Sequence, residues 1–171
     1  LQPVNAVGKW RNSKVTGVQR FAREVDEQIK NAFEFQYNER FYNSHGRLGG
    51  VLLSQLLPWW HRSVAAYGPC NIGVAFKKRQ LVVVHDTAVY DVPDSYRKGF
   101  ILYYKIMFRI TLPFARAIGT VSEFSKRQLE HHFPCTKGKV HVVGNGVSPF
   151  WFEGERGSKS PFLLLVSSMD P

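Results

Sequence analysis

Hydrophobic residues follow two different periods along the chain. Between residues 16 and 33 they return every three or four positions, which predicts one amphipathic helix with an apolar stripe of Val18, Phe21, Ala22, Val25, Ile29, Ala32 and Phe33. Thr16 is followed three residues later by Gln19, a capping-box signature that places the start of this helix at Thr16. Short uninterrupted apolar runs predict buried strands at 81–84, 117–121 and 140–143.

Helical patterns lie between these apolar runs, at 96–115 and again at 122–133, where Ser122 is placed to cap the helix. Buried strands that alternate with helices are typical of a parallel sheet with helices on both faces. The sequence therefore predicts an α/β, Rossmann-like fold in which the three strands are parallel members of one sheet.

Other segments have weaker patterns. Residues 1–14 show little strand character, so we expect the first strand of the sheet to be altered or missing. The aromatic-rich stretch after Phe33 reads as strand or loop, and residues 49–68 read as two short helical turns broken near Pro58. Trp59, Trp60 and the aromatic face of the 96–115 helix are expected in the core.

The organisation near the end of the chain changes abruptly. Residues 148–161 are rich in Gly, Ser and Pro, as a linker would be, and 162–171 begin with a new apolar strand. We therefore predict a domain at 1–147, a linker at 148–161, and at 162–171 the first strand of a second domain that is cut at its start.

Composition and charge narrow the class of protein. The chain is 44% hydrophobic and 21% charged, which indicates a globular protein, and no apolar run is long enough to span a membrane. The net charge of +10 favours an anionic membrane surface or a phosphate-bearing ligand. The basic residues are dispersed, which argues against nucleic acid. Two cysteines without metal-ligand spacing predict a reduced, cytoplasmic protein.

Polar residues that follow the predicted strands are the candidate site. His85 and Asp86 come directly after 81–84, at the sheet edge where ligands of parallel sheets bind. A histidine there can hydrogen-bond a sugar hydroxyl or stabilise developing charge, and an aspartate can orient it. The alternative is a polar pair that only satisfies local backbone groups.

Two helix starts offer a second kind of candidate, because helix N-termini favour anions. Gly17, next to Thr16, would let a ligand approach the backbone, although a plain helix cap explains the same residues. At the 122–133 helix, Ser122 to Lys126 lie at the same predicted edge, with Lys126 within reach of a phosphate or carboxylate. Asn145-Gly146 follows the third strand and reads as a turn or hinge. His131 and His132 point about 100° apart on a helix, so they make a poor metal pair.

Five stretches occur in an order that resembles the family 4 glycosyltransferases: TGVQRFARE (16–24), LVVVHDTAVYDVP (81–93), TVSEFSK (120–126), KVHVVGNGV (139–147) and FLLLVSSMDP (162–171). The likeness is greatest to bacterial mannosyltransferase-like enzymes of surface-polysaccharide assembly. It implies a GT-B enzyme with two Rossmann-like domains, the N-terminal one binding the acceptor and the C-terminal one most of the nucleotide sugar. The segment before Thr16 departs from the family's first strand.

The resemblance also implies substrates and residue roles. The donor would be a nucleotide sugar such as GDP-mannose or a UDP-sugar, and its sugar would be transferred with retention to a glycan or polyprenyl-linked acceptor. No cofactor or metal would be needed. The enzyme would lie in the cytoplasm, in peripheral contact with the inner face of the membrane. By carry-over, Gly17 would lie near the donor phosphates, Arg20 on the cleft side of its helix, and His85 against the transferring sugar with Asp86 beside it. Further residues would line the cleft or begin the hinge: Ser122, Glu123, Ser125, Lys126, Asn145 and Gly146.

Two other classes remain open on the residues alone. One is a non-catalytic α/β ligand-binding domain, and the other is a different α/β enzyme that acts on a phosphorylated ligand.

Overall fold

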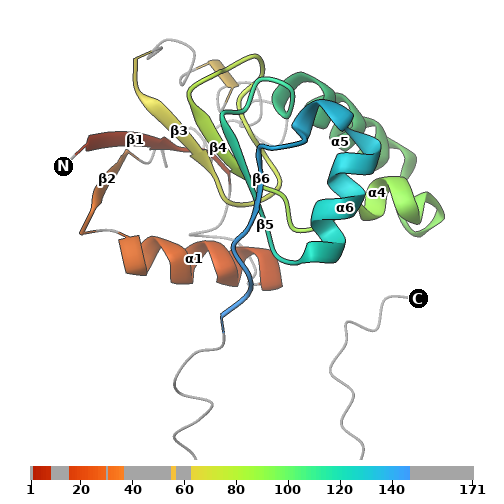
Figure 1. Ribbon diagram of the computed structural model, residues 1–171, viewed down its shortest axis with the longest axis horizontal. Helices are drawn as coiled ribbons and strands as arrows, with labels where there is room; N and C mark the ends of the chain where they lie inside the picture. The colour runs from red at the N-terminus through yellow and green to blue at the C-terminus, as the bar shows by residue number, and fades with distance from the viewer. Residues whose placement is uncertain (1, 9–15, 30, 37–54, 57–62, 147–171) are drawn as a thin grey trace, which may run out of the picture.

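The computed structural model describes residues 2–8, 16–29, 31–36, 55–56 and 63–146. Its centre is a parallel sheet of six strands in the order β2-β1-β3-β4-β5-β6 (Figure 1). The strands are β1 Gln2–Ala6, β2 Phe33–Gln36, β3 Ala65–Gly68, β4 Gln80–Val83, β5 Ala117–Thr120 and β6 Val140–Val142. All carboxyl ends therefore meet at one edge of the sheet.

Helices cover both faces of this sheet, as predicted. The helix α1 Gly17–Ile29 joins β1 to β2, whereas the later connections step across the sheet in the opposite direction. Those connections contain α4 Ala88–Asp91, η1 Pro93–Ser95, α5 Lys98–Thr111, α6 Glu123–His132 and η2 Pro134–Thr136. Because crossovers between parallel strands are right-handed, opposite steps put their helices on opposite faces. Figure 1 shows α1 on one side and α4, α5 and α6 together on the other.

The main core lies between β4, β5, β6 and the helices α5 and α6. Phe108 and Leu112 from the α5 segment meet Ile118 of β5 and Leu129 of α6, and all four are at most 1% exposed. Helical spacing puts Phe108 and Leu112 on one face, and full burial of each such side chain contributes roughly 1.5–3 kcal/mol. This core holds the strands that lead into the candidate site.

The three predicted strands are parallel neighbours in one sheet, which confirms that part of the prediction. Their complete burial was a wrong expectation. Leu81, in the interior strand β4, is 40% exposed on the α1 side. Val142 and Val143 are 39% and 54% exposed because they lie in and directly after β6, the edge strand of the described sheet.

Two strands lie where the sequence pattern did not predict them. β1 occupies Gln2–Ala6, so the first strand is present and the expectation that it was altered or missing is wrong. β3 occupies Ala65–Gly68, where helical turns were expected. Each of these strands contains only one β-branched or aromatic residue, so its composition does not favour a strand, and the ladder between them fixes their conformation. The ambiguous stretch after Phe33 begins as β2.

Some predictions fall outside the described residues. Among residues 49–62 only Gln55 and Leu56 are described, and they are helical. Trp59, Trp60, the linker at 148–161 and the strand at 162–171 lie outside the described part.

The aromatic face of α5 is only partly buried. Tyr104 and Phe108 pack into the core, as expected. Tyr96 and Phe100 are 37% and 44% exposed instead: Tyr96 follows η1, and Phe100 lies in the first turn of α5.

Both predicted helix starts are confirmed. α1 begins at Gly17, and the backbone N–H of Thr16 donates to Gln19 Oε1 at 3.3 Å. α6 begins at Glu123, and Ser122 Oγ accepts a hydrogen bond from the Ser125 N–H at 3.1 Å.

Removal of the Ser122 cap should destabilise the fold measurably. We expect Ser122→Ala to lower the free energy of unfolding by about 1 kcal/mol, since a backbone N–H of the first turn loses its acceptor. Ser122→Asp keeps an acceptor and should stay near the wild type. Denaturant unfolding of the three proteins measures this, and an equal loss in both variants would contradict the capping role.

Candidate functional site at the carboxyl edge of the sheet

The polar residues predicted from the sequence do follow adjacent strands. His85 and Asp86 come after β4, Ser122 comes after β5, and Asn145-Gly146 comes after β6. Since β4, β5 and β6 are parallel and paired in that order, these residues share the carboxyl edge of the sheet. This is the edge at which open parallel sheets bind ligands.

His85 is the most tightly held residue of this edge. Its backbone N–H donates to Asn71 Oδ1 at 2.7 Å, and its carbonyl oxygen accepts from Ser125 Oγ at 3.1 Å. On the imidazole, Nε2 lies 2.9 Å from the carbonyl oxygen of Pro69. Hydrogen bonds therefore hold the ring and backbone of His85 against the loop that follows β3 and against α6.

These contacts define the protonation state of the imidazole. A carbonyl oxygen can only accept, so Nε2 carries the proton and Nδ1 presents a lone pair. Burial lowers the pKa of His85, against smaller opposing effects of the Pro69 hydrogen bond and the Asp86 charge, and the residue is only 8% exposed. The neutral ring can thus accept a hydrogen bond or a proton at Nδ1.

The loop after β3 supplies partners that the sequence analysis missed. Asn71 adopts a left-handed conformation at φ 59° and donates its N–H to the Val83 carbonyl at 3.0 Å. Gly68 lets this loop fold back tightly, because a Cβ there would lie 1.9 Å from the Ile72 carbonyl oxygen. The stretch Gly68-Pro69-Cys70-Asn71 carried a turn signal, but nothing in its composition pointed to His85.

The first helix also reaches this edge. Phe21 packs edge-on against His85, with ring centroids 4.9 Å apart. Gly17 lies at the start of the helix with open space where a Cβ would be. Arg20 pairs with Glu24 at 3.0 Å, and both side chains are about half exposed. Phe21 was expected only as part of the apolar stripe, and its contact with His85 had no sequence signal.

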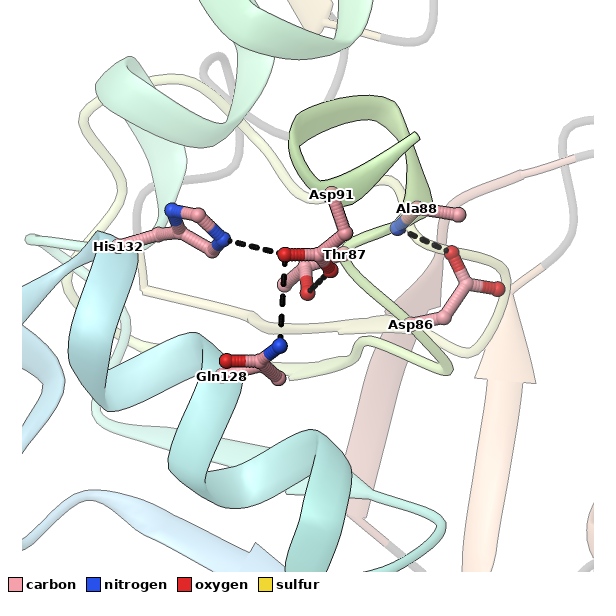
Figure 2. A network of polar contacts seen from close by, with 6 residues as sticks. All are labelled: Asp86, Thr87, Ala88, Asp91, Gln128 and His132. Carbon is pink, nitrogen blue, oxygen red and sulfur yellow. Dashed lines mark hydrogen bonds and ion pairs between the residues drawn. The ribbon is translucent and has the colours of Figure 1, made fainter. Parts of the chain in front are cut away.

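Asp86 has a local backbone role and an exposed carboxylate. Figure 2 shows Oδ1 accepting from the Ala88 N–H at 3.0 Å, at the start of α4. The neighbouring network is separate: Asp91 accepts from Thr87 Oγ1 at 2.5 Å and lies 2.7 Å from His132 Nε2. Despite some desolvation, these two hydrogen bonds lower the pKa of Asp91. Asp91 therefore links α4 to α6, whereas the exposed carboxylate of Asp86 holds the start of α4 through the Ala88 N–H.

The residues at the start of α6 differ in burial and in contact with His85. Ser125 is 7% exposed and touches His85, so the structure brings these two predicted residues together. Glu123 is exposed and Lys126 is half-buried, and neither has a described side-chain contact with His85. After β6, the left-handed residue is Gly144 at φ 71°, one position before the predicted turn at Asn145-Gly146.

A large hollow lies on the α1 face of the sheet and reaches the same edge. Its volume is about 1160 Å³, and its lining is mostly apolar, including Phe21, Leu81, Val83, Val143, Gly144 and Gly146. In the part of the chain that the structure describes, no three His, Cys, Asp or Glu side chains gather as a metal site. No described helix is long and apolar enough to cross a bilayer.

A six-stranded parallel sheet with paired helices and polar strand ends defines a Rossmann-like ligand-binding domain. The family model described as Glycosyltransferase Family 4 matches residues 37–149, and the chain belongs to this family. The resemblance to the family 4 glycosyltransferases is thereby confirmed, and membership of this family implies a sugar donor and an acceptor. No curated protein matches the chain.

Proposed function

We propose that this chain is the acceptor-side part of a retaining, nucleotide-sugar-dependent glycosyltransferase. Its reaction would transfer a hexosyl group, for which mannosyl is the proposed identity, to a glycan or polyprenyl-linked acceptor in surface-polysaccharide biosynthesis. In this proposal residues 1–147 form the acceptor-side domain, 148–161 a linker, and 162–171 the opening strand of the donor-binding domain.

The observation that carries the proposal is the fixed, neutral imidazole of His85 at the carboxyl edge. Its Nε2 is occupied by Pro69, so Nδ1 is the nitrogen that can accept a hydrogen bond from a sugar hydroxyl. Its backbone is held by Asn71 and Ser125, and its ring is held by the Pro69 hydrogen bond and by Phe21. A preorganised acceptor of this kind can act on the charge that develops in the sugar at the transition state.

The other residues of the edge would supply recognition. The exposed carboxylate of Asp86 can bind an acceptor hydroxyl, and Lys126 can reach a phosphate or carboxylate from the first turn of α6. The open start of α1 at Gly17 suits the donor phosphates, since its N–H groups and dipole favour anions. Arg20 lies one turn further along α1, where its pairing with exposed Glu24 is weak enough to exchange for a ligand. Glu123 at the N-terminus of α6 and Asn145-Gly146 after β6 are the remaining residues of the proposed binding site at this edge.

Binding measurements on the 171-residue chain test whether it binds the acceptor and leaves the nucleotide sugar to the donor-binding domain. We expect calorimetry with UDP- and GDP-sugars to show no micromolar affinity and no turnover, because most of the nucleotide site is assigned to the donor domain. A short-chain polyprenyl phosphate should bind and shift the NMR signals of the His85 ring. The exposed His131 on α6 is the internal control, and its signals should stay unchanged.

The alternatives give different results in the same experiment. Micromolar binding of nucleotide sugars would overturn the assignment to the acceptor side. A non-catalytic ligand-binding domain would bind free glycans without any preference for phosphate-bearing acceptors. A different α/β enzyme for phosphorylated ligands would turn over a sugar phosphate without any acceptor.

A further inference from the structure

A cleft at the amino edge of the sheet is lined by basic residues. Its volume is about 790 Å³, and its cations come from Lys78, Arg79, Arg116 and Lys139, with residues 113–115 as its apolar part. Arg79, Arg116 and Lys139 directly precede β4, β5 and β6. The basic cleft therefore lies at the opposite edge of the sheet from the candidate functional site.

The sheet places three of these cations in a row. β4, β5 and β6 are parallel neighbours, and the Arg116 N–H donates to the Gln80 carbonyl oxygen at 3.1 Å. The Lys139 carbonyl oxygen accepts from the Ile118 N–H at 2.9 Å. Because adjacent strands lie about 4.8 Å apart, the backbone positions of Arg79, Arg116 and Lys139 span roughly 10 Å. A row this short presents several positive charges to a single ligand.

Backbone carbonyl groups orient two of the cations without neutralising them. Lys139 Nζ donates to the Pro113 carbonyl oxygen at 2.8 Å, just after α5. Arg79 Nη1 donates to the Ser63 carbonyl oxygen at 3.0 Å. The carboxyl end of a helix carries only about half an elementary negative charge, so the end of α5 cannot offset the cations of the cleft. Both side chains keep their charge and most of their donors.

Acidic side chains are absent from the lining of the cleft as far as the structure describes it. Lys78 and Arg116 are exposed, and neither forms an ion pair with a described residue. The segments that lead into the three strands, 75–80, 109–117 and 131–140, contain no Asp or Glu. A concave group of cations that no acidic residue balances attracts anions.

We propose that the basic cleft binds a soluble ligand through an oligophosphate group, carried by a nucleoside triphosphate or by inorganic polyphosphate. Arginine and lysine are the side chains that bind phosphate oxygens, and several adjacent phosphates match several adjacent cations. Small-molecule sites are concave and have volumes of roughly 300–1,000 Å³, a range that includes this cleft. A protein partner would cover about 800 Å² of surface, far more than the mouth of such a cleft. The inference does not rest on the proposed transferase activity.

Calorimetry with tripolyphosphate tests the proposal on matched charge variants. Lys78→Gln with Arg116→Gln removes one lysine and one arginine from the cleft. Lys98→Gln with Arg127→Gln removes the same two residue types from exposed positions on α5 and α6. The first pair should raise the Kd roughly 10- to 30-fold, because one ion pair about 4 Å apart in water contributes about fivefold. The second pair should change the Kd only slightly.

Two calorimetric results would overturn the proposal. Equal losses of affinity in both pairs would mean that net charge alone causes binding. No binding of tripolyphosphate by the wild-type chain at physiological salt would mean that the cleft is not a phosphate site. Thermal unfolding of each variant confirms that it is folded.

NMR tests where the ligand binds. Tripolyphosphate should shift the signals of Ala115 and Lys139, which line the cleft, and leave those of the His85 ring unchanged. Shifts confined to His85 would place the anion at the carboxyl edge and contradict the proposal. A nucleotide sugar should bind far more weakly than tripolyphosphate, because both ends of its diphosphate are esterified and it carries fewer charges.

A comparison of ligands distinguishes the two sources of the oligophosphate group. Phe114 lines the cleft and packs edge-on against exposed Phe76, with ring centroids 5.3 Å apart, so a base has an aromatic surface beside the cations. If the ligand is a nucleoside triphosphate, ATP or GTP binds more tightly than tripolyphosphate, and Phe114→Leu removes the difference. If it is inorganic polyphosphate, longer chains bind most tightly and Phe114→Leu changes nothing. Binding to phosphatidylglycerol vesicles that tripolyphosphate does not compete with, in place of binding to soluble phosphates, would overturn the proposal.

Discussion

Gly68→Ala should lower the free energy of unfolding by about 3 kcal/mol or more, which corresponds to a fall of roughly 10 °C in the unfolding midpoint. The added Cβ would lie 1.9 Å from the Ile72 carbonyl oxygen and 3.0 Å from its carbonyl carbon. Both atoms are backbone, so no side-chain rotation relieves the clash, and the loop after β3 must move. That loop carries Pro69 and Asn71, two of the residues that hold His85.

Gly99→Ala is the matched control for this substitution. Gly99 lies in α5 with no heavy atom within 4 Å of an added Cβ, so the same chemical change meets open space. We expect it to raise the free energy of unfolding by roughly 0.5–1 kcal/mol, because alanine has the higher helix propensity. Calorimetric unfolding of both variants measures the contrast. A Gly68→Ala protein as stable as the wild type would show that the loop can open without cost, and that His85 is held less rigidly than its contacts indicate.

The elements with a strong period were predictable from the sequence. The stripe of α1 extends over enough residues to show a helical period, and uninterrupted apolar runs between helical patterns marked β4 and β5. The helix starts were predictable because the side chains of Gln19 and Ser122 accept hydrogen bonds from backbone N–H groups only three residues away. Local interactions of this kind leave a local pattern.

The missed elements depend on residues far apart in the chain. β1 and β3 each contain a single β-branched or aromatic residue, and what makes them strands is their mutual pairing, Val4 with Ala65 and Asn5 with Ala66. The contacts of His85 with Pro69, Asn71 and Phe21 likewise span 14 residues or more of sequence. The position of His85 at a strand end was predictable, but the identity of its partners was not, because no single-sequence pattern encodes a long-range contact.

In a full-length enzyme that joins this chain to a donor-binding domain, we expect His85→Ala to lower kcat roughly 100- to 1000-fold, a loss of about 2.7–4 kcal/mol in transition-state stabilisation. The imidazole is neutral, buried and fixed, and in a retaining transfer positive charge develops on the sugar while the leaving phosphate becomes more negative. A contact that strengthens as this charge develops affects kcat more than acceptor binding. Asp86→Asn should have a smaller effect if Asp86 only orients its neighbour. His131→Ala, at an exposed histidine of α6, should leave kcat unchanged.

Two conservative variants separate a contact with the sugar from an anchoring role. A glutamine at position 85 can place an amide N–H where Nε2 now donates to Pro69, but it has no acceptor at the position of Nδ1. An asparagine can place an acceptor near the Nδ1 position while losing the Pro69 hydrogen bond. If Nδ1 contacts the sugar, His85→Asn should retain more kcat than His85→Gln, although its unfolding midpoint is lower. If the histidine only satisfies the Pro69 carbonyl, the order reverses: His85→Gln keeps both its midpoint and its kcat, and the catalytic assignment of His85 is wrong. Turnover and thermal unfolding measured on the same preparations decide between the two roles.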